Sequence, residues 1–124
     1  MVELSVEDIL EIHKRGIERW GGDGRLKAET RDAVGAALYS ASYHDGVIAY
    51  AAALLCYLAR AQHFMDGSKR TGWGSCVRAL ELNGFTLDVT DESAASFVKD
   101  AVVVGRMDVA DIAERISDWL TLVE

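Results

Sequence analysis

The residues best suited to chemistry lie in one short run, Asp66-Gly67-Ser68-Lys69-Arg70. Gly67 permits a tight turn and lets an anion approach the backbone, and a helix is expected to begin near Ser68. The first turn of a helix presents unpaired N–H groups and the positive end of the helix dipole. Ser68, Lys69 and Arg70 add a hydroxyl and two cations there. The run therefore predicts an anion site, with phosphate as the expected ligand.

Asp66 is the unusual member of this run, because a carboxylate repels phosphate. It fits the site if it holds a magnesium ion that bridges to the phosphates, or if it accepts a proton. The same five residues also suit an ordinary helix start, with a capping residue and charges in solvent. Spacing alone leaves both interpretations open.

Two predicted helices position the run. Residues 47–61 are apolar all round, with Arg60 as their only charge, which is typical of a central helix covered on every side. The loop 62–67 follows, and the next helix runs from about Ser68 to the stop at Asn83-Gly84. The backbone of the run is therefore expected to be held rigidly at both ends.

Four further helices complete the prediction. The first begins after Ser5, with Asp8 completing a near capping box, and the second covers residues 30–42. Thr90 and Asp108 are the expected caps of the fifth and sixth helices. Residues 85–89 form the only strand-like piece, which is too short to build a sheet. The sequence therefore predicts an all-α, compact six-helix fold with a buried central helix, in one domain over residues 1–124.

Composition excludes several classes of function. The chain has 124 residues and a net charge of -7, which argues against direct nucleic-acid binding and against an anionic membrane surface. Its most apolar run, residues 47–59, is shorter than the roughly 20 residues of a membrane span. Cys56 and Cys76 are expected to be reduced core residues, and no signal peptide is visible at the start, so a cytoplasmic location is expected.

The remaining chemistry-bearing side chains have plainer explanations. His13 lies on the apolar face of the first helix and is expected to be a hydrogen-bonded core histidine, whereas His44 lies in a polar turn and is expected to be solvated. The tryptophans are assigned to the core by default, and no Cys/His spacing resembles a zinc site. These tryptophans are Trp20, Trp73 and Trp119.

Residues 62–70 resemble the signature of the Fic/Doc family, His-x-Phe-x-Asp/Glu-Gly-Asn-Gly/Lys-Arg. Arg19-Trp20-Gly21-Gly22 is similar to the Arg-Tyr-Gly-Gly of Doc-type proteins, and Leu82-Asn83-Gly84-Phe85 is also alike. The length resembles that of the compact Doc branch, the death-on-curing toxins of toxin–antitoxin pairs. The family fold is a six-helix domain, which agrees with the helices predicted above.

The resemblance implies a nucleotide-dependent transferase that moves part of a nucleotide onto a hydroxyl of a target protein. Most members transfer AMP, but Doc-type members carry Lys at the position of Lys69 and transfer phosphate. The implied cofactors are ATP and Mg2+, the implied reaction is phosphorylation of a threonine on elongation factor Tu, and the implied partner is a separate antitoxin protein. Phe64 would anchor the loop, Asp66 would orient the substrate or hold magnesium, and Gly67, Ser68, Lys69 and Arg70 would cradle the phosphates.

The chain departs from the family pattern at two positions. Gln62 stands where the family has its catalytic histidine, and Ser68 replaces the asparagine. A neutral amide cannot take the proton from the attacking hydroxyl, and losing a general base typically costs roughly 100- to 10,000-fold in rate. His63 would serve as a substitute base only if the loop shifted by one residue with Phe64 still buried. Its plainer role is that of a partly exposed loop histidine.

Three functions follow. The chain is a Doc-like protein kinase, weakened by Gln62; or an inactive relative that binds a nucleotide or an antitoxin; or an adenylyltransferase of the ordinary Fic type. Lys69 argues against the third function, and Gln62 favours the second.

Overall fold

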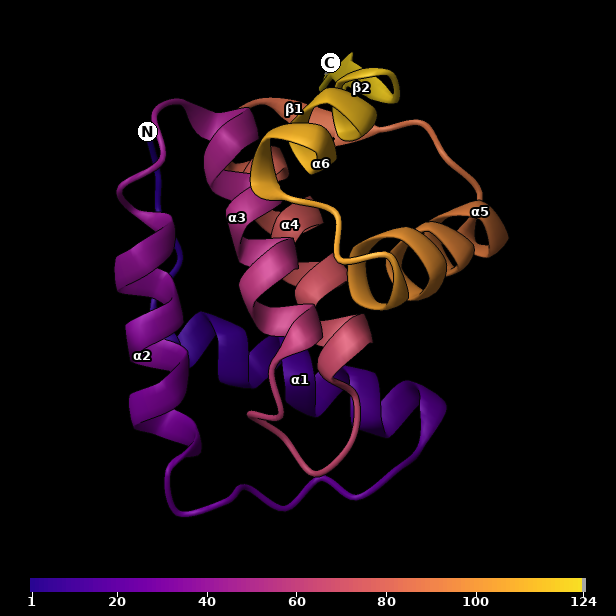
Figure 1. Cartoon of the computed structure of the whole chain (residues 1–124). Coiled ribbons are helices and arrows are strands. Elements are labelled where there is room, and N and C mark those ends of the chain that lie inside the picture. Colours follow the sequence, from indigo (N-terminus) through magenta and orange to yellow (C-terminus); the bar gives the residue numbers. More distant parts are fainter. Residues whose placement is uncertain (124) are drawn as a thin grey trace.

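The computed structural model describes residues 1–123, and Figure 1 shows the order of the elements in space. The elements are α1 (Val6–Trp20), α2 (Thr30–Ala41), α3 (Val47–Arg60), α4 (Ser68–Leu82), β1 (Phe85–Leu87), α5 (Asp91–Ser96), η1 (Phe97–Val104), α6 (Val109–Ser117) and β2 (Leu120–Leu122). The fold is all-α, as predicted, apart from one short two-stranded ladder in the described residues.

Helix α3 is the centre of the fold. All residues from Tyr50 to Cys56 are buried, and α2, α4, α6 and η1 pack around the helix. The approach of α4 is close: a Cβ placed on Gly72 would lie 2.9 Å from the backbone nitrogen of Ala59. The α3–α4 hairpin therefore fixes both ends of residues 61–67, the motif loop, as the sequence predicts (Figure 1).

The predicted helix starts are confirmed. Ser5 and Asp8 form a capping box at α1, and the side chains of Thr90 and Asp108 accept hydrogen bonds from backbone N–H groups at α5 and α6. The ends of α2 and α3 lie one residue earlier than expected, because the last turn of a helix often frays. Cys56 and Cys76 are buried free thiols, as predicted.

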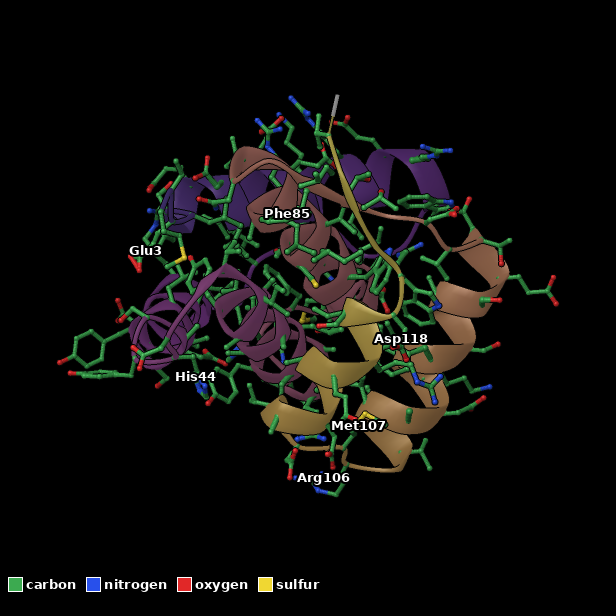
Figure 2. The ribbon with its side chains drawn as sticks, turned by 90° about the horizontal axis from the view of Figure 1, so that it is seen from above. Glu3, His44, Phe85, Arg106, Met107 and Asp118 are labelled. Atoms are coloured by element: carbon green, nitrogen blue, oxygen red, sulfur yellow. The ribbon has the colours of Figure 1, made fainter. Side chains whose placement is uncertain are left out.

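Three expectations for the C-terminal third are wrong. The strand-like segment does build a ladder, because β1 pairs antiparallel with β2. The spacing of Trp119 from Ile112 and Ile116 predicts that it lies on the stripe of the sixth helix, but it lies beyond the end of α6, and its ring packs edge-on against Trp73. The fifth helix changes to the wider π form from Phe97 onward (η1), and the turn at Arg106 and Met107 then leads into α6 (Figure 2).

Two side chains near the N-terminal helices also differ from expectation. His44 is half-buried and its Nε2 atom lies 2.9 Å from the hydroxyl of Tyr57, so it is paired and not merely solvated. Trp20 is 59% exposed, because α1 extends beyond the core at its C-terminal end. Within residues 1–123, no helix combines the length and apolar character that crossing a bilayer requires.

Candidate functional site

The start of α4 is arranged to receive an anion. Gly67 is the N-cap residue and adopts the left-handed conformation, with φ of +87°, which favours glycine. No side chain of the described residues caps this helix, so the first-turn N–H groups are not occupied in that way. Ser68 is the first helical residue and not the cap. The positive end of the helix dipole is therefore available to a ligand.

Phe64 anchors the motif loop to α1. Its side chain is buried and its ring stacks on the His13 ring, with centroids 4.0 Å apart and planes 12° apart. The Nε2 atom of His13 lies 2.8 Å from the carbonyl oxygen of Asp66. His13 is thus a buried, hydrogen-bonded histidine, as predicted, but its partner is the backbone of the candidate site. This positioning role could not be predicted, since nothing in the sequence spacing connects residues 13 and 66.

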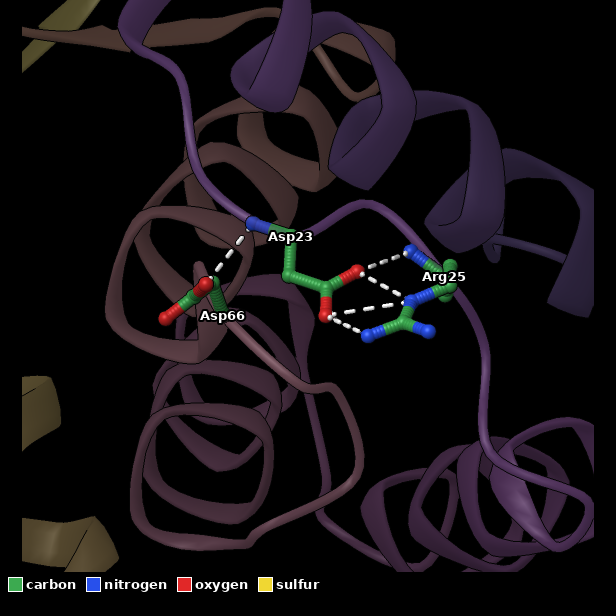
Figure 3. A network of polar contacts seen from close by, with 3 residues as sticks. All are labelled: Asp23, Arg25 and Asp66. Atoms are coloured by element: carbon green, nitrogen blue, oxygen red, sulfur yellow. Dashed lines mark hydrogen bonds and ion pairs between the residues drawn. The ribbon is translucent and has the colours of Figure 1, made fainter.

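Residues 21–30, which we call the strap, lie along the motif loop and bind it through polar contacts. The Asp23 N–H donates to Oδ2 of Asp66 at 2.7 Å (Figure 3). The Lys27 ammonium donates to the carbonyl of Gln62 at 2.8 Å, and the Thr30 hydroxyl donates to the carbonyl of His63 at 2.7 Å. The strap therefore holds the backbone of Gln62 and His63 and the side chain of Asp66, and this contribution was also missed from sequence.

Gly22 explains part of the Arg-Trp-Gly-Gly segment. Its φ is +114°, and a Cβ atom placed there would lie 3.1 Å from the Cβ of Asp66. A larger residue would therefore strain the backbone and crowd the carboxylate. The close approach lets the Asp23 N–H reach Asp66 and leaves the second carboxylate oxygen of Asp66 outside this hydrogen bond.

The two cations of the motif have different surroundings. Arg70 donates to the carbonyl of Gly21 at 3.0 Å, and its guanidinium carbon lies 5.6 Å from the centre of the Trp20 ring. Lys69 is exposed, and no carboxylate of the described residues forms an ion pair with it. Arg70 is therefore held in place by the end of α1, whereas Lys69 can meet a bound anion directly.

A third cation of this region is neutralised within the strap. Asp23 accepts hydrogen bonds from the guanidinium of Arg25, with the Nη2 to Oδ2 distance at 2.7 Å (Figure 3). These hydrogen bonds lower the pKa of Asp23 to about 2, so that its carboxylate stays charged at neutral pH. Lys69 and Arg70 are therefore the cations that define the start of α4.

Gln62 and His63 lie in the motif loop, before the helix start that carries Ser68, Lys69 and Arg70. The Gln62 side chain is exposed and cannot titrate, and its carbonyl is occupied by Lys27. His63 is half-buried, and burial lowers its pKa, while hydrogen bonding to the backbone of Tyr57 partly offsets this. Asp66, Gly67, Ser68, Lys69 and Arg70, in contrast, are together at the start of α4.

The Asp66 carboxylate fits a metal ion that takes most of its ligands from phosphate oxygens and water, and not from the protein. Within residues 1–123, no group of three or more His, Cys, Asp or Glu side chains is placed to hold a metal ion. Mg2+ is usually bound by one or two carboxylates together with phosphate oxygens and water. The single carboxylate of Asp66, with one oxygen outside the Asp23 hydrogen bond, satisfies that requirement beside a phosphate site.

Comparison with known proteins agrees with this geometry. No curated protein matches the chain. The family model described as "Fic/DOC family" matches residues 3–80, which is more than half of the chain and includes α1, the strap, the motif loop and most of α4. Because the matched region contains the helix start and the segments that position it, the chain belongs to the Fic/DOC family of nucleotide-transferring domains.

Proposed function

We propose that this chain is a Doc-type member of the family that binds ATP with Mg2+ and slowly transfers phosphate to a hydroxyl of a protein. The observation that carries the proposal is the start of α4, where an uncapped helix N-terminus meets the exposed Lys69 and the fixed Arg70. The motif's resemblance to the Doc branch supplies the expected target, a threonine of elongation factor Tu, and the toxin role. Such a target lies in the cytoplasm.

Lys69 supports phosphate transfer over AMP transfer. It stands at the motif position where AMP-transferring members have glycine and Doc-type members have lysine. An ammonium group at the first turn of α4 places a point charge where the terminal phosphate of a nucleotide would be held. Arg70 is restrained by Gly21 and Trp20, so it offers its remaining donors at little cost in conformational entropy.

The reaction requires the hydroxyl oxygen of the target to bond to the terminal phosphorus of ATP as the bond to ADP breaks, while the hydroxyl proton passes to water. Bound ATP with Mg2+ would supply the phosphoryl group and neutralise its charge. Asp66 is the carboxylate closest in sequence to the anion site, and its hydrogen bond with Asp23 fixes its orientation. We assign Asp66 to orienting the target hydroxyl or holding Mg2+.

Gln62 explains why the transfer should be slow. Without a titratable group at that position, the rate is expected to fall by roughly 100- to 10,000-fold. His63 is a weak substitute, because burial lowers its pKa and so makes the ring a weaker base. These two observations favour a second candidate function, that of an inactive relative that binds a nucleotide or a separate antitoxin protein at the start of α4.

The deciding experiment measures the intact mass of elongation factor Tu after incubation with this chain, ATP and Mg2+. A gain of one phosphate supports the kinase, whereas a gain of one AMP contradicts it. Lys69→Ala should abolish the gain, while Arg78→Ala, an exposed arginine later on α4, should leave it unchanged.

The variant Gln62→His separates the two candidates. It should accelerate phosphate transfer at least 100-fold if only the base is missing. If the Gln62→His variant modifies the target and the parent chain does not, the result supports the second candidate, a binding protein that has lost its catalytic residue. No modification by either chain, together with ATP binding that Lys69→Ala does not weaken, contradicts the phosphate site itself.

A further inference from the structure

A cavity lies outside the region that matches the family model. It has a volume of about 640 Å3 and is formed by the segment after β1, by α5 and η1, and by the end of α6. Small-molecule sites typically measure roughly 300–1,000 Å3. Neither the motif loop nor the strap contributes to it, so it is independent of the proposed nucleotide site.

Aromatic rings form the apolar part of this C-terminal cavity. Phe97 is buried and packs edge-on against Trp119, with ring centroids 5.3 Å apart. The guanidinium carbon of Arg115 lies 5.6 Å from the centre of the Phe97 ring. The chain thus places one of its own guanidinium groups over this ring, which shows that the aromatic surface accepts a cation.

Carboxylates outnumber cations around the rings. Asp88, Glu92 and Asp100 line the cavity together with Arg115, and all four are exposed. Within residues 1–123, Arg115 forms no ion pair with these acids. The N–H of Asp88 donates to the carbonyl of Trp119 at 2.7 Å, which holds one acid beside the tryptophan. The cavity therefore favours cations and repels nucleotides and other anions.

The π form of η1 shapes this cavity. Phe97, Asp100 and Ala101 of η1 all line it. The Gly105 N–H closes the last wide turn on the carbonyl of Asp100 at 2.9 Å, and a Cβ atom on Gly105 would lie 2.9 Å from the carbonyl oxygen of Ala101. π-helical turns are rare and occur frequently at functional sites. The unusual backbone and the cavity therefore coincide.

We propose that the C-terminal cavity binds a guanidinium group. Its flat face would stack on the partly exposed ring of Trp119, and its N–H donors would meet the carboxylates of Glu92 and Asp100. The group is carried either by a small guanidine or by an arginine side chain of a basic peptide, and the net charge of -7 favours the approach of either.

Binding is measured by NMR at the indole N–H of Trp119, assigned with the variant Trp119→Phe. The probes are butylguanidinium and the peptide acetyl-Gly-Arg-Gly-amide, and butylurea is the uncharged control of the same shape. We expect a saturable shift with a charged probe and none with butylurea. Tighter binding of the peptide identifies a peptide ligand, and tighter binding of butylguanidinium identifies a small guanidine. Absence of a saturable shift, or an equal shift with butylurea, overturns the proposal.

Variants test the roles of the charged residues. Glu92→Gln and Asp100→Asn should each weaken binding about tenfold, since a charge-assisted hydrogen bond is lost. Glu114→Gln, on α6 but outside the cavity, is the matched control and should bind normally. Arg115→Gln should tighten binding, because the face of Phe97 is released. Equal loss in Glu114→Gln, or weaker binding by an Arg115→Gln variant with an intact NMR spectrum, overturns the proposal.

Discussion

The start of α4, with its cations Lys69 and Arg70, and the C-terminal cavity, with its carboxylates, are built on different frameworks. The charged groups of the motif come from one short run of residues, and hydrogen bonds from the strap hold the Asp66 side chain and the backbone of Gln62 and His63. The carboxylates of the cavity come from separate segments and surround a cluster of aromatic rings. A contiguous site is visible in the sequence, but the contacts that hold it are not. A site assembled from distant segments is invisible until the chain is folded.

The largest effect is expected where α4 crosses α3 behind the motif. Gly72→Ala places a methyl group 2.9 Å from the backbone nitrogen of Ala59, and two backbones cannot yield as a side-chain tip would. We expect a loss of about 3 kcal/mol in the free energy of unfolding, measured by chemical denaturation.

Gly35→Ala is the matched control for that substitution. Gly35 is also a helical glycine, but its added Cβ would meet only Val6 Cγ2, at 3.8 Å. This variant should gain up to about 1 kcal/mol, since alanine favours a helix over glycine. A loss below 1 kcal/mol in Gly72→Ala would contradict a rigid α3–α4 crossing.

The next effect concerns the link between η1 and α3. The half-buried Arg60 donates from Nε to the carbonyl of Val102 at 2.7 Å and from Nη2 to the carbonyl of Met107. Arg60→Met keeps the apolar stem and removes these bonds, so we expect a loss of about 2 kcal/mol.

Hydrogen exchange should locate the effect of Arg60→Met. Amides of residues 97–108 should exchange faster while those of the strap are unchanged, because the backbone carbonyls that Arg60 binds are those of Val102 and Met107. Arg78→Met, at an exposed arginine, should change stability by less than about 0.5 kcal/mol. Faster exchange in the strap would show that the two regions are coupled.

A smaller effect is expected from releasing the strap. Thr30 is fully buried, and its hydroxyl accepts from the Lys27 N–H at 2.9 Å and donates to the carbonyl of His63 at 2.7 Å. Thr30→Val conserves the shape and loses both bonds, at a cost of about 1.5 kcal/mol.

Strap amides should then exchange faster, whereas Thr86→Val on β1 should leave their exchange unchanged. If the strap amides exchange at the same rate in Thr30→Val and in the parent chain, the strap is held mainly by its contacts with Asp66 and Gln62 and not by Thr30.

The same contrast explains what the sequence could predict. Helix starts depend on local capping residues such as Ser5 and Asp108, so they were predicted closely. The contacts of the strap could not be predicted, because they use the backbone N–H of Asp23 and the backbone carbonyl of His63. Every residue has a backbone carbonyl, so such contacts leave no pattern in the sequence. The π form of η1 was missed because its apolar residues also fit an ordinary helical period. The pairing of β1 with β2 joins segments too short to show an alternating pattern.

The smallest expected effect is a shift in the pKa of His63. It tests whether the His63 ring faces α3 or the start of α4. Burial lowers the pKa of His63 below its ordinary value of 6.5, and the positive charge of Lys27 lowers it further. The folded chain therefore prefers neutral His63. This contribution to stability is complete above pH 6.5 and is lost as the pH falls below 6.5 toward the folded pKa.

NMR titration of the His63 ring should thus give a midpoint below 6.5, and Lys27→Gln should raise it because a neighbouring cation is removed. Saturating inorganic phosphate should leave the midpoint unchanged if the ring faces the backbone of Tyr57, whose hydrogen bonding raises its pKa, and not the start of α4. A bound phosphate raises the pKa of any histidine beside it. A higher midpoint in phosphate would therefore place His63 within the anion site and restore it as the base that Gln62 cannot be.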